Sequence, residues 1–345
     1  MAVKTPAVSP LSDSPLETKL NPLSLNTGIA PATMSSTDNS LRVLVWNVWQ
    51  AGNNVDQGPE KILTIINEVK PDIVLLQESY DINGERPRIG EWLAGQLKWQ
   101  QHQGESTHLC VLTPLNIETT FFHHAWHGVG AKIRDSKGRE LLAWSIWIDY
   151  RAYITYALRE NPAITDEELL DLERVGSNRL NQATAIIEHL RESGQLEADI
   201  PLLVGGDWNC PSHLDWTVDT TRVYKRRRAL PLPVSLAMSS AGFTDTFRLL
   251  HPNPVQHPGF TWSPMFRFKG EGEGQVDQCF DRIDRLYLKN PATPKDGLTL
   301  QPTSAHVLPL VWEDENMATV DREFPSDHAA VVIDLVWTPP LNTLN

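Results

Sequence analysis

Residues 202–209 read LLVGGDWN and join an apolar, β-type run to an aspartate and an asparagine. The apolar part is typical of a strand that is buried on both faces of a sheet, and we expect a strand over 200–204. Such a strand has no use for a carboxylate unless the carboxylate is paired or binds a metal. Asp207 and Asn209 therefore mark a candidate site. Gly205 and Gly206 are expected to let the backbone turn sharply there.

The same change from apolar to polar residues recurs elsewhere in the chain. In chain order the sequences are Val45-Trp46-Asn47, Leu75-Leu76-Gln77-Glu78, Phe280-Asp281-Arg282-Ile283-Asp284 and Pro325-Ser326-Asp327-His328. The strands that we expect beside them cover 42–48, 71–77, 280–288 and 329–337. One polar residue at a strand end means little, but several Asp, Glu, Asn and His residues indicate a shared site where strand ends converge.

The remaining pattern alternates strands with helices, which predicts an α/β fold. Apolar residues at helical spacing predict helices over 59–70, 89–99 and 178–193, and short strands are expected near 108–113, 115–123, 129–133 and 139–149. Thr165 and Glu168 have the spacing of a capping box. We interpret residues 1–40, which hold five prolines, seven serines and no aromatic residue, as a disordered tail before one catalytic domain over 41–340. Residues 250–278 are expected to form a long functional loop.

Composition excludes several classes of protein. With 41% hydrophobic residues the chain is not disordered throughout, and no apolar run reaches the ~18 residues of a membrane span. A formal charge of −13 argues against a nucleic-acid binder that relies on a broad positive surface, although a metal ion can supply local positive charge. The three cysteines are too widely spaced for a disulfide framework and are interpreted as small buried residues. No signal peptide is visible, so we expect a cytoplasmic protein.

Carboxylate and amide oxygens at converging strand ends suit Mg²⁺ or Mn²⁺, which prefer oxygen ligands. An aspartate and a histidine in the same place supply a general base and a group that stabilises negative charge on phosphate. The residue types alone therefore favour metal-dependent phosphate chemistry.

The ordered series Trp46-Asn47, Gln77-Glu78, Gly206-Asp207-Trp208-Asn209, Arg282-Ile283-Asp284 and Ser326-Asp327-His328 resembles the endonuclease/exonuclease/phosphatase, or DNase I-like, superfamily. The resemblance runs from about residue 41 to 337. It implies a four-layer α/β sandwich with two packed mixed β-sheets flanked by helices. It also implies a divalent-metal-dependent phosphohydrolase that cleaves phosphodiester bonds, most simply a nuclease or phosphodiesterase, with a phosphate ester or nucleic acid as substrate and the monomer as the working form.

Two other interpretations stay open. One is a phosphatase or lipid phosphodiesterase that acts on a small phosphorylated headgroup. The other is a binding protein that kept the fold and lost the chemistry. The acidic net charge and the tryptophans that flank the expected site favour the first mildly, and the second is disfavoured because the whole polar series is present.

The resemblance implies a role for each matched residue. The expected metal ligands are Glu78, Asn47 and Asp327, with Mg²⁺ or Mn²⁺ as the ion. Four catalytic residues are expected. Asp207 would orient or deprotonate water, and Asn209 would position water and phosphate. His328 would contact the scissile phosphate, and Asp284 would orient His328. Asp281 also precedes an Arg-Ile pair; the family pattern Arg-Ile-Asp favours Asp284 and leaves Asp281 as a supporting residue or a partner of Arg282.

One position departs from the family pattern. Many members carry a phosphate-contacting histidine at the end of a central strand, where this chain has Trp147. An indole cannot shuttle a proton, so Tyr150 or Tyr153 is the candidate replacement. Trp46, Trp49 and Trp208 also flank the expected site, and packing between the layers is the expected role for most of these tryptophans. The basic run at 225–228 is interpreted as a solvated face.

Overall fold

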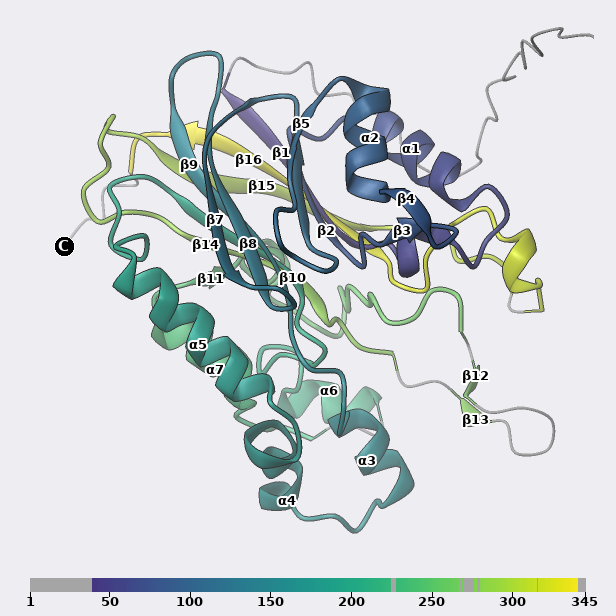
Figure 1. Cartoon of the computed structure of the whole chain (residues 1–345). Helices are drawn as coiled ribbons and strands as arrows, with labels where there is room; N and C mark the ends of the chain where they lie inside the picture. Colours follow the sequence, from purple (N-terminus) through teal and green to yellow (C-terminus); the bar gives the residue numbers. More distant parts are fainter. Residues whose placement is uncertain are drawn as a thin grey trace, which may run out of the picture.

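The computed structural model describes residues 39–224, 228–266, 268–269, 276–277, 280–314 and 316–340 (Figure 1). Within these residues two six-stranded mixed sheets pack face to face, and helices lie on the outer face of each sheet. The predicted four-layer α/β sandwich is therefore confirmed. Residues 1–38 of the predicted tail, residues 225–227 of the basic run and Cys279 lie outside the described residues.

The first sheet has the strand order β15-β16-β1-β2-β6-β5. Its strands are β15 (Thr299–Leu308), β16 (Ala330–Thr338), β1 (Ser40–Asn47), β2 (Ile73–Gln77), β6 (Cys110–Thr113) and β5 (Gln100–His102). Only the β1–β2 pair is parallel among these neighbours. The parallel pair thus lies at the centre of the sheet.

The second sheet repeats this plan with the order β11-β14-β10-β9-β8-β7. Its strands are β11 (Thr244–Asp245), β14 (Asp284–Lys289), β10 (Leu202–Asp207), β9 (Glu140–Trp147), β8 (Gly128–Arg134) and β7 (Asn116–His124). Its parallel pair is β9–β10. Two short hairpins lie outside the sheets: β3 (Asp81–Ile82) with β4 (Glu85–Arg88), and β12 (Phe268–Lys269) with β13 (Val276–Asp277).

The central strands are apolar on both faces because both faces are covered. Val43 and Val45 of β1 face the core between the sheets, and the alternate residues Leu44 and Trp46 face the helical layer. In β10, Leu203 belongs to the core between the sheets. This period of two is what a continuous apolar strand produces when it is buried on both sides.

The first sheet is covered by α1 (Gly58–Val69) and α2 (Ile89–Leu97), and the second by α5 (Arg179–Glu192) and α7 (Pro233–Ser240). Further helical segments are α3 (Ile154–Glu160), α4 (Asp166–Asp171), α6 (Val218–Val223) and α8 (Thr246–Leu250), with η1 (Gln50–Gly52), η2 (Leu172–Gly176) and η4 (Thr319–Asp321). The capping box of Thr165 and Glu168 begins α4 as predicted. Among the described residues no helix is long and apolar enough to cross a membrane.

The expected role of the glycine pair is wrong. Gly205 and Gly206 lie inside β10 and pair with β14 and β9 in regular register. A Cβ atom on Gly205 would lie 2.7 Å from Leu75 and 2.8 Å from Val45 of the facing sheet, and one on Gly206 would lie 1.9 Å from the carbonyl oxygen of Ile146. Glycine is needed at 205 for close approach of the facing sheet and at 206 for close approach of the neighbouring strand β9, rather than for a turn. The left-handed turn occurs after the strand, at Asn209 (φ 50°).

Candidate active site

The polar residues of the five motifs meet at one edge of the sandwich. The parallel strands β1 and β2 of the first sheet, and β9 and β10 of the second, all end at this edge. The antiparallel strands β14 and β16 begin there, because Asp284 pairs with Asp207 and Val331 pairs with Val45. Residues that follow some strands and precede others are thereby placed side by side.

Asn47 lies between the two sheets and joins them. Its buried side-chain amide donates hydrogen bonds to Oε1 of Glu78 (3.1 Å) and to Oδ2 of Asp207 (3.2 Å). The other oxygen of Glu78 accepts from the backbone N–H of Gln50 (2.8 Å). One amide thus sets the spacing between a carboxylate of the first sheet and a carboxylate of the second.

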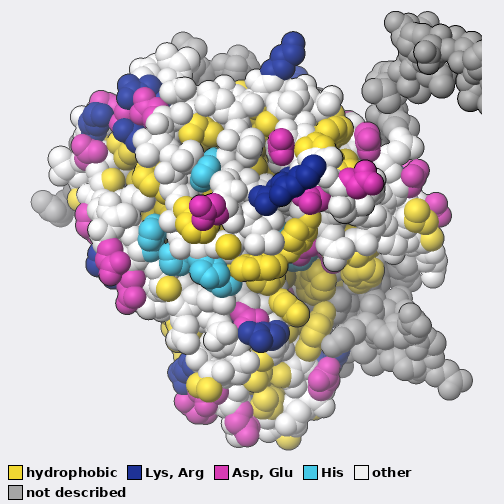
Figure 2. All heavy atoms as spheres, in the orientation of Figure 1, with side chains coloured by type: hydrophobic (Ala, Val, Ile, Leu, Met, Phe, Trp, Pro, Cys, Tyr) yellow, Lys and Arg dark blue, Asp and Glu magenta, His cyan; other side chains and the backbone are white. Residues whose placement is uncertain are grey.

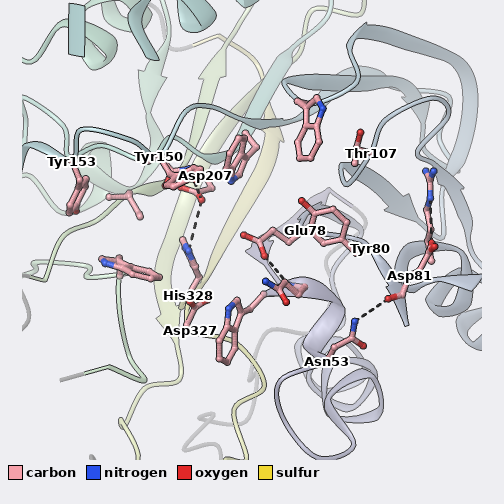
Figure 3. A pocket seen from close by; sticks show the side chains of 18 of the residues that line it. Asn53, Glu78, Tyr80, Asp81, Thr107, Tyr150, Tyr153, Asp207, Asp327 and His328 are labelled. Atoms are coloured by element: carbon pink, nitrogen blue, oxygen red, sulfur yellow. Dashed lines mark hydrogen bonds and ion pairs between the residues drawn. The ribbon is translucent and has the colours of Figure 1, made fainter. Parts of the chain in front are cut away.

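His328 lies between two carboxylates. Its Nδ1 is 3.0 Å from Oδ2 of Asp284, and its Nε2 is 3.9 Å from Oδ2 of Asp207 (Figure 3). Burial alone would lower the pKa of His328, but the charges of Asp284 and Asp207 raise it well above 6.5. The imidazole is therefore protonated at neutral pH, with Nδ1–H donated to Asp284 and Nε2–H directed to the Asp207 side.

Asp207 is held by the turn that follows it. Its Oδ1 accepts from the backbone N–H of Asn209 (2.9 Å), and its Oδ2 accepts from the Asn209 side-chain amide (3.0 Å). Burial raises the pKa of Asp207 to about 7, although the neighbouring His328 opposes this shift. A carboxyl group with a pKa near neutrality can take up a proton and release it again under ordinary conditions.

The donor set fits a divalent cation. Burial raises the pKa of Asp327 to about 8, with the nearby Glu78 and Asp207 adding to the shift. Oδ1 of Asp327 is buried and has no hydrogen-bond partner among the described residues. Crowded carboxylates with an orphaned oxygen are what a bound cation would satisfy. Oxygens of Glu78 and Asp327 match the preference of Mg²⁺ and Mn²⁺. Asn47 instead turns its amide N–H groups toward Glu78 and Asp207, and its Oδ1 accepts from the backbone N–H of Trp49 (3.0 Å).

A second group of possible ligands is less suited to a metal. Ligand atoms of Asp207, Asp284 and His328 lie within 4.8 Å of one another. A ligating histidine must be neutral, however, and His328 is surrounded by carboxylates that favour its protonated form. This trio is better suited to proton transfer than to metal binding.

Asp281 and Asp284 have different surroundings. Asp281 accepts hydrogen bonds from the hydroxyl groups of Tyr153 (2.8 Å) and Thr155 (2.6 Å), whereas Asp284 contacts His328. Arg282 between them is buried and pairs with two other carboxylates, Asp215 and Asp245.

Part of the expected loop at 250–278 supports the site. The Thr261 hydroxyl accepts from the backbone N–H groups of Ile283 and Asp284, both at 3.0 Å, and the Trp262 ring lies 4.8 Å from that of His328. This segment therefore fixes the position of Asp284 and covers one side of the imidazole.

His108 was missed by sequence reasoning. Its Nδ1 accepts from the backbone N–H of Glu78 (3.1 Å), its carbonyl oxygen accepts from the N–H of Ser79 (2.8 Å), and its Nε2 contacts the carbonyl oxygen of Trp126 (3.2 Å). Burial lowers its pKa to about 4, so it is a neutral imidazole that accepts at Nδ1 and donates at Nε2. It holds Glu78 in a left-handed conformation (φ 58°) that costs energy for a residue with a side chain. A lone histidine before an apolar strand carries no sequence signal of this role.

The site opens into a cavity of about 840 Å³ that contains Glu78, Asp207, Asn209, Asp327 and His328. Among the described residues, eight aromatic side chains line it: Trp49, Tyr80, Trp126, Trp147, Tyr150, Tyr153, Tyr156 and Trp262. Figure 2 shows a band of hydrophobic side chains running into a hollow on this face of the molecule. The cavity thus combines a polar floor with aromatic walls.

The four tryptophans singled out in the sequence divide into two pairs. Trp46 and Trp208 are fully buried and pack under the helical layers. Trp49 and Trp147 line the cavity. Packing is therefore the role of the first pair, and only the second pair can meet a ligand.

Comparison with known proteins agrees with this architecture. The model of the Endonuclease/Exonuclease/phosphatase family matches residues 44–328. An uncharacterized protein of Caenorhabditis elegans is 31% identical over 314 residues, which cover 89% of this chain and 94% of that protein. Among solved structures, humanized D. rerio TDP2 with 14 mutations is 16% identical, covers 86% of this chain and 98% of its own, and has a TM-score of 0.53. Truncated Caenorhabditis elegans TDP2 is 14% identical over 86% of this chain and 97% of its own, with a TM-score of 0.50.

Proposed function

The chain belongs to the endonuclease/exonuclease/phosphatase family, whose members are metal-dependent hydrolases of phosphate esters, and we propose that it is a phosphodiesterase or nuclease acting at the Asp207–His328 edge of the sandwich. The observation that carries this proposal is the placement of His328 between Asp284 and Asp207 on the wall of a cavity that also holds Glu78 and Asp327. An imidazolium and a cation site on one cavity wall together suit a phosphate group.

Glu78 and Asp327 would hold Mg²⁺ or Mn²⁺, which when bound would offset negative charge on the phosphate. Asn47, expected as a third ligand, would act by keeping the Glu78 carboxylate in place through its amide hydrogen bond. Asp207 would accept the proton of the attacking water as the oxygen of that water forms its bond to phosphorus. Asn209 and Asn47 keep the Asp207 carboxylate in place for this transfer through their hydrogen bonds. His328 would donate Nε2–H to a phosphate oxygen whose charge grows as the P–O bond to the leaving group breaks.

The leaving oxygen must gain a proton when the ester is cleaved. Trp147 cannot supply one, and the hydroxyl group of Tyr153 is already donated to Asp281. Tyr150 lines the same cavity and is 64% exposed, so its hydroxyl group is the better placed of the two candidates. We therefore assign the leaving-group side of the cavity to the Tyr150 wall.

A phosphatase or lipid phosphodiesterase that acts on a small headgroup is the second candidate. The aromatic walls of the cavity and the net charge of −13 favour it over a nuclease that grips a long polyanion. Both candidates use the same chemistry and differ in the size of the substrate.

The proposal is tested by incubating the purified protein with plasmid DNA, with RNA and with bis(p-nitrophenyl) phosphate, each in Mg²⁺, Mn²⁺ or EDTA. We expect hydrolysis of at least one of the three that requires the metal. Cleavage of the small diester alone would favour the headgroup enzyme over the nuclease. Failure to hydrolyse any of them with either metal would contradict the proposed phosphodiesterase.

His108→Ala is expected to lower kcat/KM for the substrate found above by about tenfold and to raise the Mg²⁺ concentration needed for half-maximal rate. The physical reason is that the backbone of Glu78 loses the acceptor that fixes it. The control is His102→Ala, which removes a partly buried histidine that contacts the carbonyl oxygen of Phe121 instead. Equal kinetic effects of the two changes would show that His108 is merely a structural residue.

A further inference from the structure

The cavity extends beyond the catalytic residues to two arginines. Arg86 and Arg88 lie on the hairpin formed by β3 and β4, which follows Glu78 by a few residues, and both line the same cavity as Asp207 and His328. In Figure 3, Glu78 and Tyr80 lie between His328 on one side and Asp81 on the other. Since Arg86 and Arg88 both pair with Asp81, they mark an end of the cavity that is distinct from the scissile-phosphate position.

The two guanidinium groups keep a net positive charge at this end. Both pair with the single carboxylate of Asp81, at 3.5 Å for Arg86 and 3.8 Å for Arg88. Pairs of this length near solvent are weak and exchange readily for another anion. Among the described residues, the two guanidinium groups thus share one paired carboxylate, that of Asp81, in a chain whose overall charge is −13.

The two arginines differ in how firmly they are held. Arg88 donates from Nη1 to the carbonyl oxygen of Ser106 (2.7 Å), and its side chain is only 21% exposed. Arg86 is 63% exposed, and within the described parts of the chain its side chain pairs only with Asp81. One arginine is therefore fixed at the cavity wall, and the other is free to close over a ligand.

Aromatic rings fill the distance between the two ends. His108 packs on Tyr80 (centroids 5.4 Å apart), on Trp126 (5.1 Å) and on Trp147 (5.2 Å), and these three aromatic residues line the cavity. Because its ring contacts all three, buried His108 supports this wall from behind. A flat group bound beside the scissile phosphate would meet these rings.

We propose that Arg86 and Arg88 form a second phosphate subsite, so that the substrate is a phosphodiester with a flat group and a further phosphate beyond it. This inference rests on the proposed function, because it takes the Asp207–His328 position as the place of the scissile phosphate. A phosphate suits the subsite because its several oxygens can accept hydrogen bonds from both guanidinium groups at once.

Binding is tested in the Asp207→Asn protein with Mg²⁺, in which slow turnover leaves the ligand intact. Calorimetry compares the dinucleotide TpT with its 5′-phosphorylated and 3′-phosphorylated forms. We expect one phosphorylated form to bind about tenfold more tightly than TpT. Adding Arg86→Gln and Arg88→Gln together should remove this preference, whereas Arg191→Gln, an exposed arginine on α5 outside the cavity lining, should leave it unchanged.

The possible binding results distinguish failure of the second phosphate subsite from failure of the proposed hydrolysis. Equal binding of all three dinucleotides, or a preference that survives the double arginine change, would overturn the second phosphate subsite even if the wild-type protein hydrolyses diesters. An arginine-dependent preference in a protein that hydrolyses no ester would support the subsite and contradict the proposed reaction. A thermal unfolding measurement on the double variant checks that loss of binding is not loss of the fold.

Discussion

Asp207→Asn is expected to lower kcat for a phosphodiester by at least about 10³-fold, because it removes the group that would accept the proton of the attacking water. The fold should survive the change. Burial raises the pKa of Asp207 to about 7, so at pH 8 the ionised carboxylate is a net cost to the folded state, and the neutral amide removes that cost. Rate measurements with bis(p-nitrophenyl) phosphate, beside a chemical unfolding curve, check both statements.

The matched control for Asp207→Asn is Asp219→Asn, the same change at an exposed carboxylate on α6. Its kcat and its free energy of unfolding should both equal those of the wild type. A rate for Asp207→Asn within about tenfold of wild type would rule out the assigned role as a proton acceptor. A large loss of stability would instead show that Asp207 holds the two sheets together.

His328→Gln is expected to lower kcat by about 10²–10⁴-fold, because the phosphate loses the charged Nε2–H donor beside Asp207. Gln keeps a hydrogen-bond donor at this position but cannot carry the charge. The change is read from kcat at saturating substrate, since the imidazolium is expected to act on the transition state more than on substrate binding.

A second change, Asp284→Asn, tests whether Asp284 acts by keeping His328 charged. The amide can still accept from Nδ1 of His328 but no longer supplies the charge that favours the imidazolium, so kcat should fall by about 10²-fold, less than for His328→Gln. The double variant should be no slower than His328→Gln alone, because both changes remove the same donor. Additive losses in the double variant would contradict the view that Asp284 acts through His328.

The strand ends were predictable because two different signals coincide there. Apolar runs such as those before Asn47 and Asp207 reveal strands buried on both faces, and a polar residue next to such a run stands out. The two-sheet sandwich itself was expected only from the resemblance to the family, because hydrophobic periodicity does not tell which strand ends share an edge. The register of β10 with β14, which places Asp207 opposite Asp284, is a long-range pairing that no local pattern encodes.

Some strands that mix apolar and polar residues were not predicted from the sequence, and β15 is an example. β15 contains Pro302 and has a bulge between Pro302 and Ser304, so it lacks the alternation that indicates a strand. It is an edge strand, where a residue without a backbone N–H is tolerated. The strand expected over 280–288 begins only at Asp284, because the preceding residues leave the sheet to support the site.

His108, Arg86 and Arg88 were not predicted for a related reason. Each is placed by contacts with parts of the chain that only the fold brings near: His108 contacts the backbone of Glu78, and the arginines line a cavity whose other walls come from distant segments. Buried Cys110 and Cys210, in contrast, follow composition alone and are confirmed as free, buried residues.

The central claim is that this edge of the sandwich hydrolyses phosphodiesters with a divalent metal and Asp207. The most direct measurement is the rate of p-nitrophenol release from bis(p-nitrophenyl) phosphate by the wild-type protein as Mg²⁺ is titrated, with EDTA and Asp207→Asn as references. The account predicts a rate that saturates with Mg²⁺, vanishes in EDTA and falls to background in Asp207→Asn. A rate that is the same in EDTA, or one that Asp207→Asn retains, would contradict it.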